Sequence, residues 1–213
     1  MANNKAHTRY IGADGIQVPG VTTVLGVLNK PFLVPWANKL GLQGIDSTKY
    51  KDEMADIGTL AHLLIMNHLR GEETDTGDFS QNDIKLANNC FASYLAWEKP
   101  HELKPILIEK PLVSDKYNYG GTADWVGYLD DELVLLDYKT GKAIYPEMFY
   151  QLAAYVQLAK EQGYEIKKAR ILRIGRDNNE GFEERTTTNF EREFEIFLHC
   201  LSIYFIQKEL KKN

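Results

Sequence analysis

The hydrophobic pattern of the chain predicts a mixed α/β protein. Apolar residues recur at helical spacing through most of residues 21–97, and from Leu103 onward the pattern changes to short runs typical of strands. A helical pattern then separates residues 132–138 from another apolar run at 168–175. A strand–helix–strand passage of this kind favours a right-handed crossover between parallel strands. We therefore expect an antiparallel meander, a crossover helix and a parallel strand, flanked by helices and preceded by an N-terminal helical region.

Composition is that of an ordinary globular protein. The chain has 213 residues, of which 44% are hydrophobic and 11% aromatic. We expect one domain over 1–213, with 1–100 mainly helical and 101–213 forming the αβ core. No run approaches the ~18 apolar residues of a membrane helix. The first residues contain no apolar segment of a secretion signal, so a cytoplasmic location without membrane attachment is expected.

Charge and cysteine content give only limited information on the class of protein. The net charge is −5, which is not the basic signature of a simple nucleic-acid-binding domain. A cleaving enzyme is not excluded, because it needs acids for a metal and only local cations for phosphates. The two cysteines, Cys90 and Cys200, fall in expected helices and predict no disulfide framework. Two cysteines are also too few to hold an iron–sulfur cluster by themselves.

Turn and capping signals divide the N-terminal half. Residues 8–11 and 16–18 flank an Asp14-Gly15 turn and predict a short hairpin. A helix from Val21 ends at Pro31 and Pro35, and another is expected over 36–42. A longer helix, capped by Asp46 or Ser47, is expected through Leu69 with Gly71 closing it, and the next runs from a Ser80 or Asn82 cap to Trp97.

The C-terminal half predicts the sheet. Three strands are expected within 103–113, 120–129 and 132–138, joined by short connections. Pro146 suits the first turn of a helix over 147–162, which Gly163 closes. Strands at 168–175 and 181–187 and a long helix over 189–211 complete the chain.

Two acids and a lysine stand out on neighbouring strands. Asp124 and Asp137 each lie away from the turn that joins their strands, so their carboxylates can converge. Alternation along a strand places Asp137 and Lys139 on one face. Converging carboxylates suit a hard divalent cation, and a nearby lysine can stabilise charge on a phosphate. The alternative is an ordinary Asp–Lys pair on a solvated strand face.

The motifs around these residues resemble the PD-(D/E)xK nuclease superfamily, and within it the RecB-like branch. The opening segment at 18–41 also resembles phage-type exonucleases and the mitochondrial genome maintenance exonuclease. The resemblance implies a restriction-endonuclease-like fold. Its motifs here are Gly58-Thr59-Leu60-Ala61-His62, Glu109, Gly121-Thr122-Ala123-Asp124, Asp137-Tyr138-Lys139-Thr140-Gly141-Lys142 and Gln151-Leu152-Ala153-Ala154-Tyr155.

The resemblance implies a role for each matching residue. Asp124, Asp137, His62 and the backbone carbonyl of Tyr138 would hold the metal, and Lys139 would be the catalytic lysine. Glu109 matches an accessory acid. From the residues alone, a lone helical histidine such as His62 is more often a packed or surface residue. Glu109 could equally be a charge on an edge strand.

Further residues are expected around the site. Gln151 and Tyr155 lie four apart on one helix face and would line the site or support the lysine, or else form a polar pair at a helix–sheet junction. Substrate contacts are expected from Lys142, Lys30, Lys39 and Tyr119. Tyr117, Trp36 and Trp125 are further candidates for stacking on bases, and the basic residues of 167–176 fit mostly a solvated face.

Together these features predict a Mg²⁺- or Mn²⁺-dependent deoxyribonuclease without an iron–sulfur cluster. The resemblance favours an exonuclease acting on DNA with a free end, preferably single-stranded, in phage or cellular recombination. The location would then be the cytoplasm, that of the host if the chain is of phage origin. A recombination partner protein is compatible with this function. The alternatives are a structure-specific endonuclease on the same fold and a catalytically silent DNA-binding or assembly protein.

Overall fold

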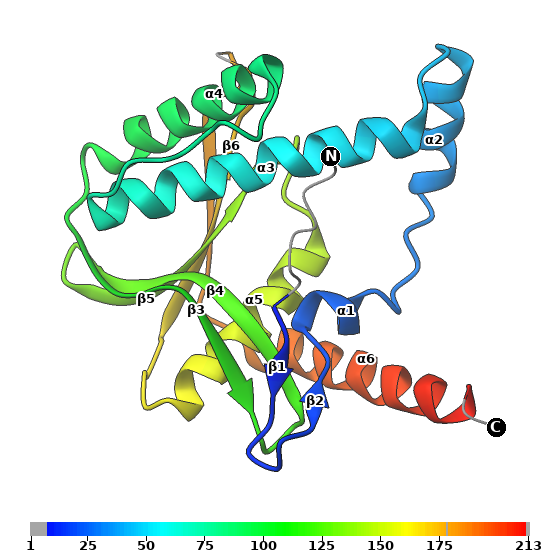
Figure 1. Cartoon of the computed structure of the whole chain (residues 1–213). Coiled ribbons are helices and arrows are strands. Elements are labelled where there is room, and N and C mark those ends of the chain that lie inside the picture. Colours follow the sequence, from blue (N-terminus) through cyan, green and yellow to red (C-terminus); the bar gives the residue numbers. More distant parts are fainter. Residues whose placement is uncertain (1–7, 178, 212–213) are drawn as a thin grey trace.

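A five-stranded mixed sheet forms the centre of the computed structural model, which describes residues 8–177 and 179–211 (Figure 1). The strands lie in the order β3-β4-β5-β6-β7. Their bounds are Leu103–Ser114, Tyr119–Leu129, Glu132–Lys139, Lys168–Ile174 and Phe182–Thr187. Only the β5–β6 pair is parallel among these neighbours, and α5, Pro146–Glu161, connects its two strands. The predicted restriction-endonuclease-like arrangement of meander, crossover helix and parallel strand is confirmed.

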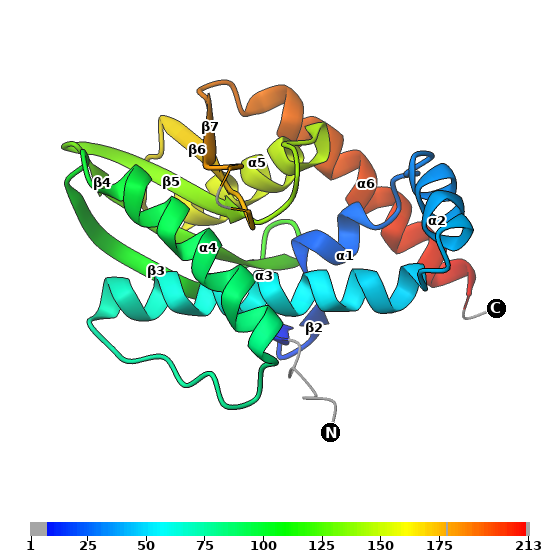
Figure 2. The ribbon, with the colours of Figure 1, turned by 90° about the horizontal axis from the view of Figure 1, so that it is seen from above.

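Helices cover both faces of the sheet (Figure 2). One layer contains α3, Ser47–Arg70, and α4, Gln81–Glu98. The other contains α5, the short α1, Val21–Leu25, and α6, Glu191–Leu210. The remaining elements are α2, Leu33–Leu42, and the hairpin of β1, Tyr10–Ile11, and β2, Gln17–Val18. None of the helices formed by the described residues combines the length and apolar character needed to cross a membrane.

Alternation along the strands divides the core into two parts. Trp125 and Leu136 pack with α3 and α4, whereas Val126 and Leu135 pack with α5 and α6. The two cysteines are buried and unbonded, and they lie in different parts: Cys90 with α4 and Cys200 with α6.

The capping signals in the sequence locate several helix ends. The Asp46 carboxylate accepts hydrogen bonds from the backbone N–H groups of Thr48 and Lys49, and Gly71 takes the left-handed conformation at the other end of α3. Ser80 forms a capping box with Asp83 at the start of α4. The expected start of the second helix at residue 36 is wrong: α2 begins at Leu33, because Pro35 is tolerated in the first turn, where its missing N–H leaves no helical hydrogen bond unmade.

Two hairpins position the strands around the candidate site. A two-residue turn joins β4 to β5, and Asp130 and Asp131 both have positive φ (51° and 63°), as in a type I′ turn. The second hairpin, β1–β2, packs on the beginning of β4, where Gly20 and Gly120 form a parallel bridge. A Cβ on Gly120 would lie 2.3 Å from the Tyr10 ring, so only glycine permits this approach.

Candidate active site

Asp124 lies where β4 separates from β5. The ladder between the two strands ends at the Trp125–Leu136 pair, and the next position in this register places Asp124 opposite Asp137. Beyond the end of the ladder, the Tyr138 N–H of β5 donates to the side chain of Asp124 instead of to a backbone carbonyl of β4. The distance from this nitrogen to Asp124 Oδ2 is 2.7 Å. The other oxygen, Oδ1, lies 3.5 Å from His62 Nδ1. Asp124 therefore links the sheet to helix α3.

His62, Glu109 and Asp124 form one cluster. One potential ligand atom from each of the three lies within 4.8 Å of the others. The residues come from α3, β3 and β4, so the N-terminal helical region contributes to the site. A histidine nitrogen and carboxylate oxygens are ligands for divalent metals, and the oxygens suit Mg²⁺ and Mn²⁺.

Close packing between two of the sequence motifs positions His62. A Cβ on Gly58 would lie 2.9 Å from Thr140 Oγ1, so α3 approaches the segment after β5 more closely than a larger residue allows. The His62 ring also packs edge-on against Tyr138, with centroids 6.0 Å apart. These two contacts bring the GTLAH segment onto the DYKTG segment.

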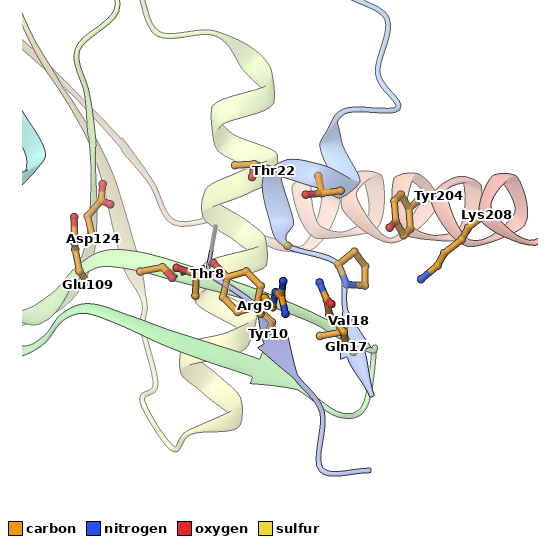
Figure 3. Close-up of a pocket in the computed structure, with 14 residues that line it drawn as sticks. Thr8, Arg9, Tyr10, Gln17, Val18, Thr22, Glu109, Asp124, Tyr204 and Lys208 are labelled. Atoms are coloured by element: carbon orange, nitrogen blue, oxygen red, sulfur yellow. Dashed lines mark hydrogen bonds between the residues drawn. The ribbon is translucent and has the colours of Figure 1, made fainter. Parts of the chain in front are cut away.

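Glu109 has an unusual backbone. Its φ is +46°, in the left-handed region that costs a non-glycine residue roughly 1–2 kcal/mol. The β3–β4 ladder pairs Ile108 with Trp125 and Lys110 with Ala123, so the register between these pairs places Glu109 opposite Asp124. The two carboxylates accordingly lie side by side in the cluster (Figure 3). Strain of this kind is found preferentially at functional sites.

Asp137 and Lys139 form an ion pair beside this cluster. Lys139 Nζ lies 2.5 Å from Asp137 Oδ2, and the Asp137 side chain is 2% exposed. Their placement on one strand face is as predicted. Asp137 is not part of the three-residue cluster, since its carboxylate contacts Lys139 instead. The ligand roles of Asp137 and of the Tyr138 carbonyl stay predictions.

The electrostatics of the two aspartates differ. Burial raises the pKa of Asp137 to about 6, against the opposing effect of Lys139. Burial acts in the same direction on Asp124, but the charge of His62 and its hydrogen bond outweigh it, so the pKa of Asp124 is lowered. Burial lowers the pKa of His62, yet the Asp124 carboxylate more than compensates and the net shift is upward. Burial, followed by the Asp124 charge, raises the pKa of Glu109.

Gln151 and Tyr155 face one another on α5. The Gln151 amide donates to the Tyr155 hydroxyl at 2.8 Å, and Tyr155 is buried. A Cβ on Gly121 would lie 2.6 Å from the Tyr155 ring, so the pair is packed directly beneath β4. This position agrees with a polar pair at the helix–sheet junction, and its contact with substrate stays a prediction.

The structure corrects several expected substrate contacts. Tyr119 is fully buried, and its hydroxyl donates to the Ala154 carbonyl at 2.9 Å, so it cannot stack on a base. Trp125 is also fully buried. Lys39 and Lys142 are exposed, while Lys30 lies 3.7 Å from the Glu147 carboxylate.

The basic residues of 167–176 are largely paired. Lys168 lies 2.6 Å from Glu132, Arg170 2.9 Å from Glu184 and Arg173 3.4 Å from Glu183. These carboxylates neutralise the basic residues, which therefore offer little free charge to a phosphate.

A groove of about 800 Å³ leads away from the acidic cluster. Glu109 and Asp124 lie at one end, and Tyr204 and Lys208 of α6 lie at the other (Figure 3). The β1–β2 hairpin and α1 contribute the residues between these ends: Thr8, Arg9, Tyr10, Gln17, Val18, Pro19, Gly20, Thr22 and Thr23, with Thr122 of β4. A hollow of about 410 Å³ on the α3 side contains His62 and also reaches Glu109. The cluster is thus open from two directions.

Sequence reasoning missed the groove-lining residues of the hairpin and of α6. Arg9 and Lys208 lie at opposite ends of the chain, and neither belongs to a recognisable motif. Only the packing of α6 against α1 and the docking of the hairpin on β4 bring them to one groove.

Comparison with known proteins gives structural likeness alone. No protein-family model and no curated protein matches this sequence. The crystal structure of SSO0001 is similar with a TM-score of 0.36 and 17% identity, over 59% of this chain and 58% of SSO0001. An alkaline exonuclease, LHK-Exo from Laribacter hongkongensis, is similar with a TM-score of 0.35 and 15% identity, over 75% of this chain and 92% of that chain. Its complex with dAMP gives a TM-score of 0.35, 16% identity and coverages of 76% and 92%.

Proposed function

We propose that this chain is a metal-dependent deoxyribonuclease, acting as an exonuclease on DNA with a free end. The observation that carries the proposal is the meeting of His62, Glu109 and Asp124 in one cluster, beside the buried Asp137–Lys139 pair. A cluster of potential metal ligands next to a lysine suits the hydrolysis of a phosphodiester. An ordinary surface Asp–Lys pair does not account for the 2% exposure of Asp137 or for the strained Glu109.

The residues of the cluster fit a divalent cation. His62 and the carboxylates of Glu109 and Asp124 would hold it, with Asp137 as a further ligand once released from Lys139. The raised pKa of Glu109 reflects burial and the nearby Asp124 charge, and a cation would relieve both. When bound, such a cation supplies polarisation of a phosphoryl oxygen and activation of a water.

The protein's own side chains have separable tasks in this proposal. The Tyr138 N–H fixes Asp124 in place, and the packing of α3 on Thr140 fixes His62. Lys139 orients the attacking water or stabilises the negative charge that develops on the phosphate. Tyr155 and Gln151 support the sheet from the α5 side, beneath the strand that carries Asp124.

The experiment is digestion of end-labelled linear single-stranded, linear duplex and circular single-stranded DNA, with Mg²⁺ and Mn²⁺ in turn. We expect cleavage of linear DNA in the presence of metal, release of short products from an end, and no cleavage of circles. Cleavage of circles would indicate the endonuclease alternative instead. Binding of DNA in EDTA with no cleavage in either metal would indicate a catalytically silent protein.

A further inference from the structure

We propose that the groove between the β1–β2 hairpin and α6 is a binding site for the single-stranded part of the substrate, with Arg9 and Lys208 contacting phosphates and Tyr204 stacking on a base. The inference rests on the proposed function, since it identifies where that function's substrate lies. It assigns a role to two segments at opposite ends of the chain that carry no sequence motif.

The groove has the chemistry of a phosphate-binding track. Beyond its acidic end, its lining contains two cations, Arg9 and Lys208, and no carboxylate. Neither cation forms an ion pair with another of the residues that the structure describes, in contrast to Lys168, Arg170 and Arg173 on the sheet. The hydroxyl groups of Thr8, Thr22 and Thr23 and the Gln17 amide add hydrogen-bonding groups for phosphate oxygens: these four also line the groove.

An aromatic side chain beside cations favours a single strand. Tyr204 is half-buried on α6, one helical turn before Lys208, so the two side chains share one face of the helix. Figure 3 shows Lys208 extending from α6 toward the hairpin that carries Arg9 and Gln17. Exposed bases stack on such aromatics while cations follow the backbone, whereas paired bases in a duplex are not available for stacking.

The groove is continuous with the candidate site and is large enough for more than a single phosphate. Glu109 and Asp124 close one end of it, so a strand lying in it would pass directly from the cluster toward α6. Its volume of about 800 Å³ lies in the upper part of the range of ligand pockets, ~300–1,000 Å³. The Tyr10 hydroxyl lies 3.0 Å from Thr122 Oγ1, and this hydrogen bond holds the hairpin side of the groove against β4.

The test measures DNA binding without cleavage. Anisotropy of a fluorescein-labelled 20-nucleotide oligothymidine is recorded in EDTA at several salt concentrations, with a duplex of equal length beside it. The variants are Arg9→Ala/Lys208→Ala and Tyr204→Leu. The matched controls are Lys85→Ala/Lys160→Ala, which removes two exposed lysines from α4 and α5 outside the groove, and Tyr204→Phe, which keeps the ring.

We expect the Arg9/Lys208 pair to weaken single-strand binding about tenfold, and to reduce the slope of log K against log salt by about 1.4, or ~0.7 for each phosphate contact. Tyr204→Leu should weaken binding about tenfold and Tyr204→Phe little. Unchanged affinity and slope in the Arg9/Lys208 pair, or an equal loss in the Lys85/Lys160 control, would overturn the proposal. The single-strand assignment would be overturned if the duplex bound as tightly as the single strand and if the groove variants weakened both equally.

The outcome is separable from that of the proposed function. Groove-dependent binding by a protein that cleaves no DNA in Mg²⁺ or Mn²⁺ would leave the groove assigned and reject the nuclease. If the protein cleaves DNA but the groove variants bind DNA as tightly as wild type, the nuclease proposal stands and the groove proposal is rejected.

Discussion

The carboxylate of Asp124 accepts a hydrogen bond from the backbone N–H of Tyr138, and in doing so it takes the place of a backbone partner where β4 and β5 part. One oxygen is committed to the sheet, and the other faces His62. Asp124 therefore has a structural task and a proposed metal-binding task, and the two can be tested apart.

Asp124→Asn should separate these tasks. The amide oxygen can still accept from the Tyr138 N–H, so the loss of stability should be limited to the interaction with His62, while metal-dependent cleavage falls by about 10²-fold or more. Asp124→Leu should lose cleavage and also about 1–3 kcal/mol of stability, because the Tyr138 N–H is left without its acceptor. Urea unfolding and a nuclease assay on the same preparations measure both. Equal stability of the two variants would contradict the structural role.

The backbone conformation of Glu109 should lower stability, while its carboxylate should contribute to metal binding. Glycine relieves the positive φ, so Glu109→Gly should be more stable than Glu109→Ala by about 1 kcal/mol, after allowing for the entropy of glycine in the unfolded chain. Both variants should bind Mn²⁺ more weakly than wild type. Thermal unfolding with and without Mn²⁺ gives the comparison. Equal stability of Glu109→Gly and Glu109→Ala would show that the positive φ at this position carries no measurable cost.

Metal binding should weaken in acid. The pKa of Asp137 is about 6, above the ordinary value of a carboxyl group, and the pKa of His62 is also raised. Protons therefore compete with a cation as the pH falls through 6, and affinity should drop by about tenfold per pH unit for each proton displaced. The rise in Tm caused by Mn²⁺ should accordingly be much smaller at pH 5 than at pH 7.5. Asp137→Asn should show a weaker pH dependence, and an equal Mn²⁺ effect at both pH values in the wild type would exclude this titration.

Gly120 should not tolerate a side chain. Alanine there would meet the Tyr10 ring at 2.3 Å, and overpacking of this kind costs about 1–3 kcal/mol. Gly41→Ala on α2 is the control, since a Cβ there meets nothing within 4 Å, and it should be neutral or stabilising. Combining Gly120→Ala with Tyr10→Ala should cost less than the sum of the two single changes. Additive costs would show that the ring and the glycine do not interact.

The sequence predicts most of the fold because its local signals are strong and agree with one another. Asp46, Gly71 and Ser80 mark helix ends through their own backbone chemistry, and the short connections within the meander fix its strand pairing. The start of α2 was missed because Pro35 signals a break as well as a first turn.

The site is predictable where it follows from strand alternation and less so where it depends on packing. Asp137 and Lys139 had to share a face, and they do. The burial of Tyr119 depends on α5 and on Phe197 of α6, whose ring lies 4.7 Å away, and no local pattern reveals this. The left-handed backbone of Glu109 and the placement of Arg9 and α6 along one groove are likewise products of the tertiary structure.

The most direct test of the account is the rate at which Asp137→Asn and Lys139→Ala degrade linear single-stranded DNA in Mg²⁺. Lys85→Ala, an exposed lysine on α4, serves as the control, and circular dichroism verifies that each variant is folded. We predict that each of the two site variants loses activity by about 10²–10³-fold while the control matches wild type. Wild-type rates in both site variants would contradict the assignment of this site as the active site.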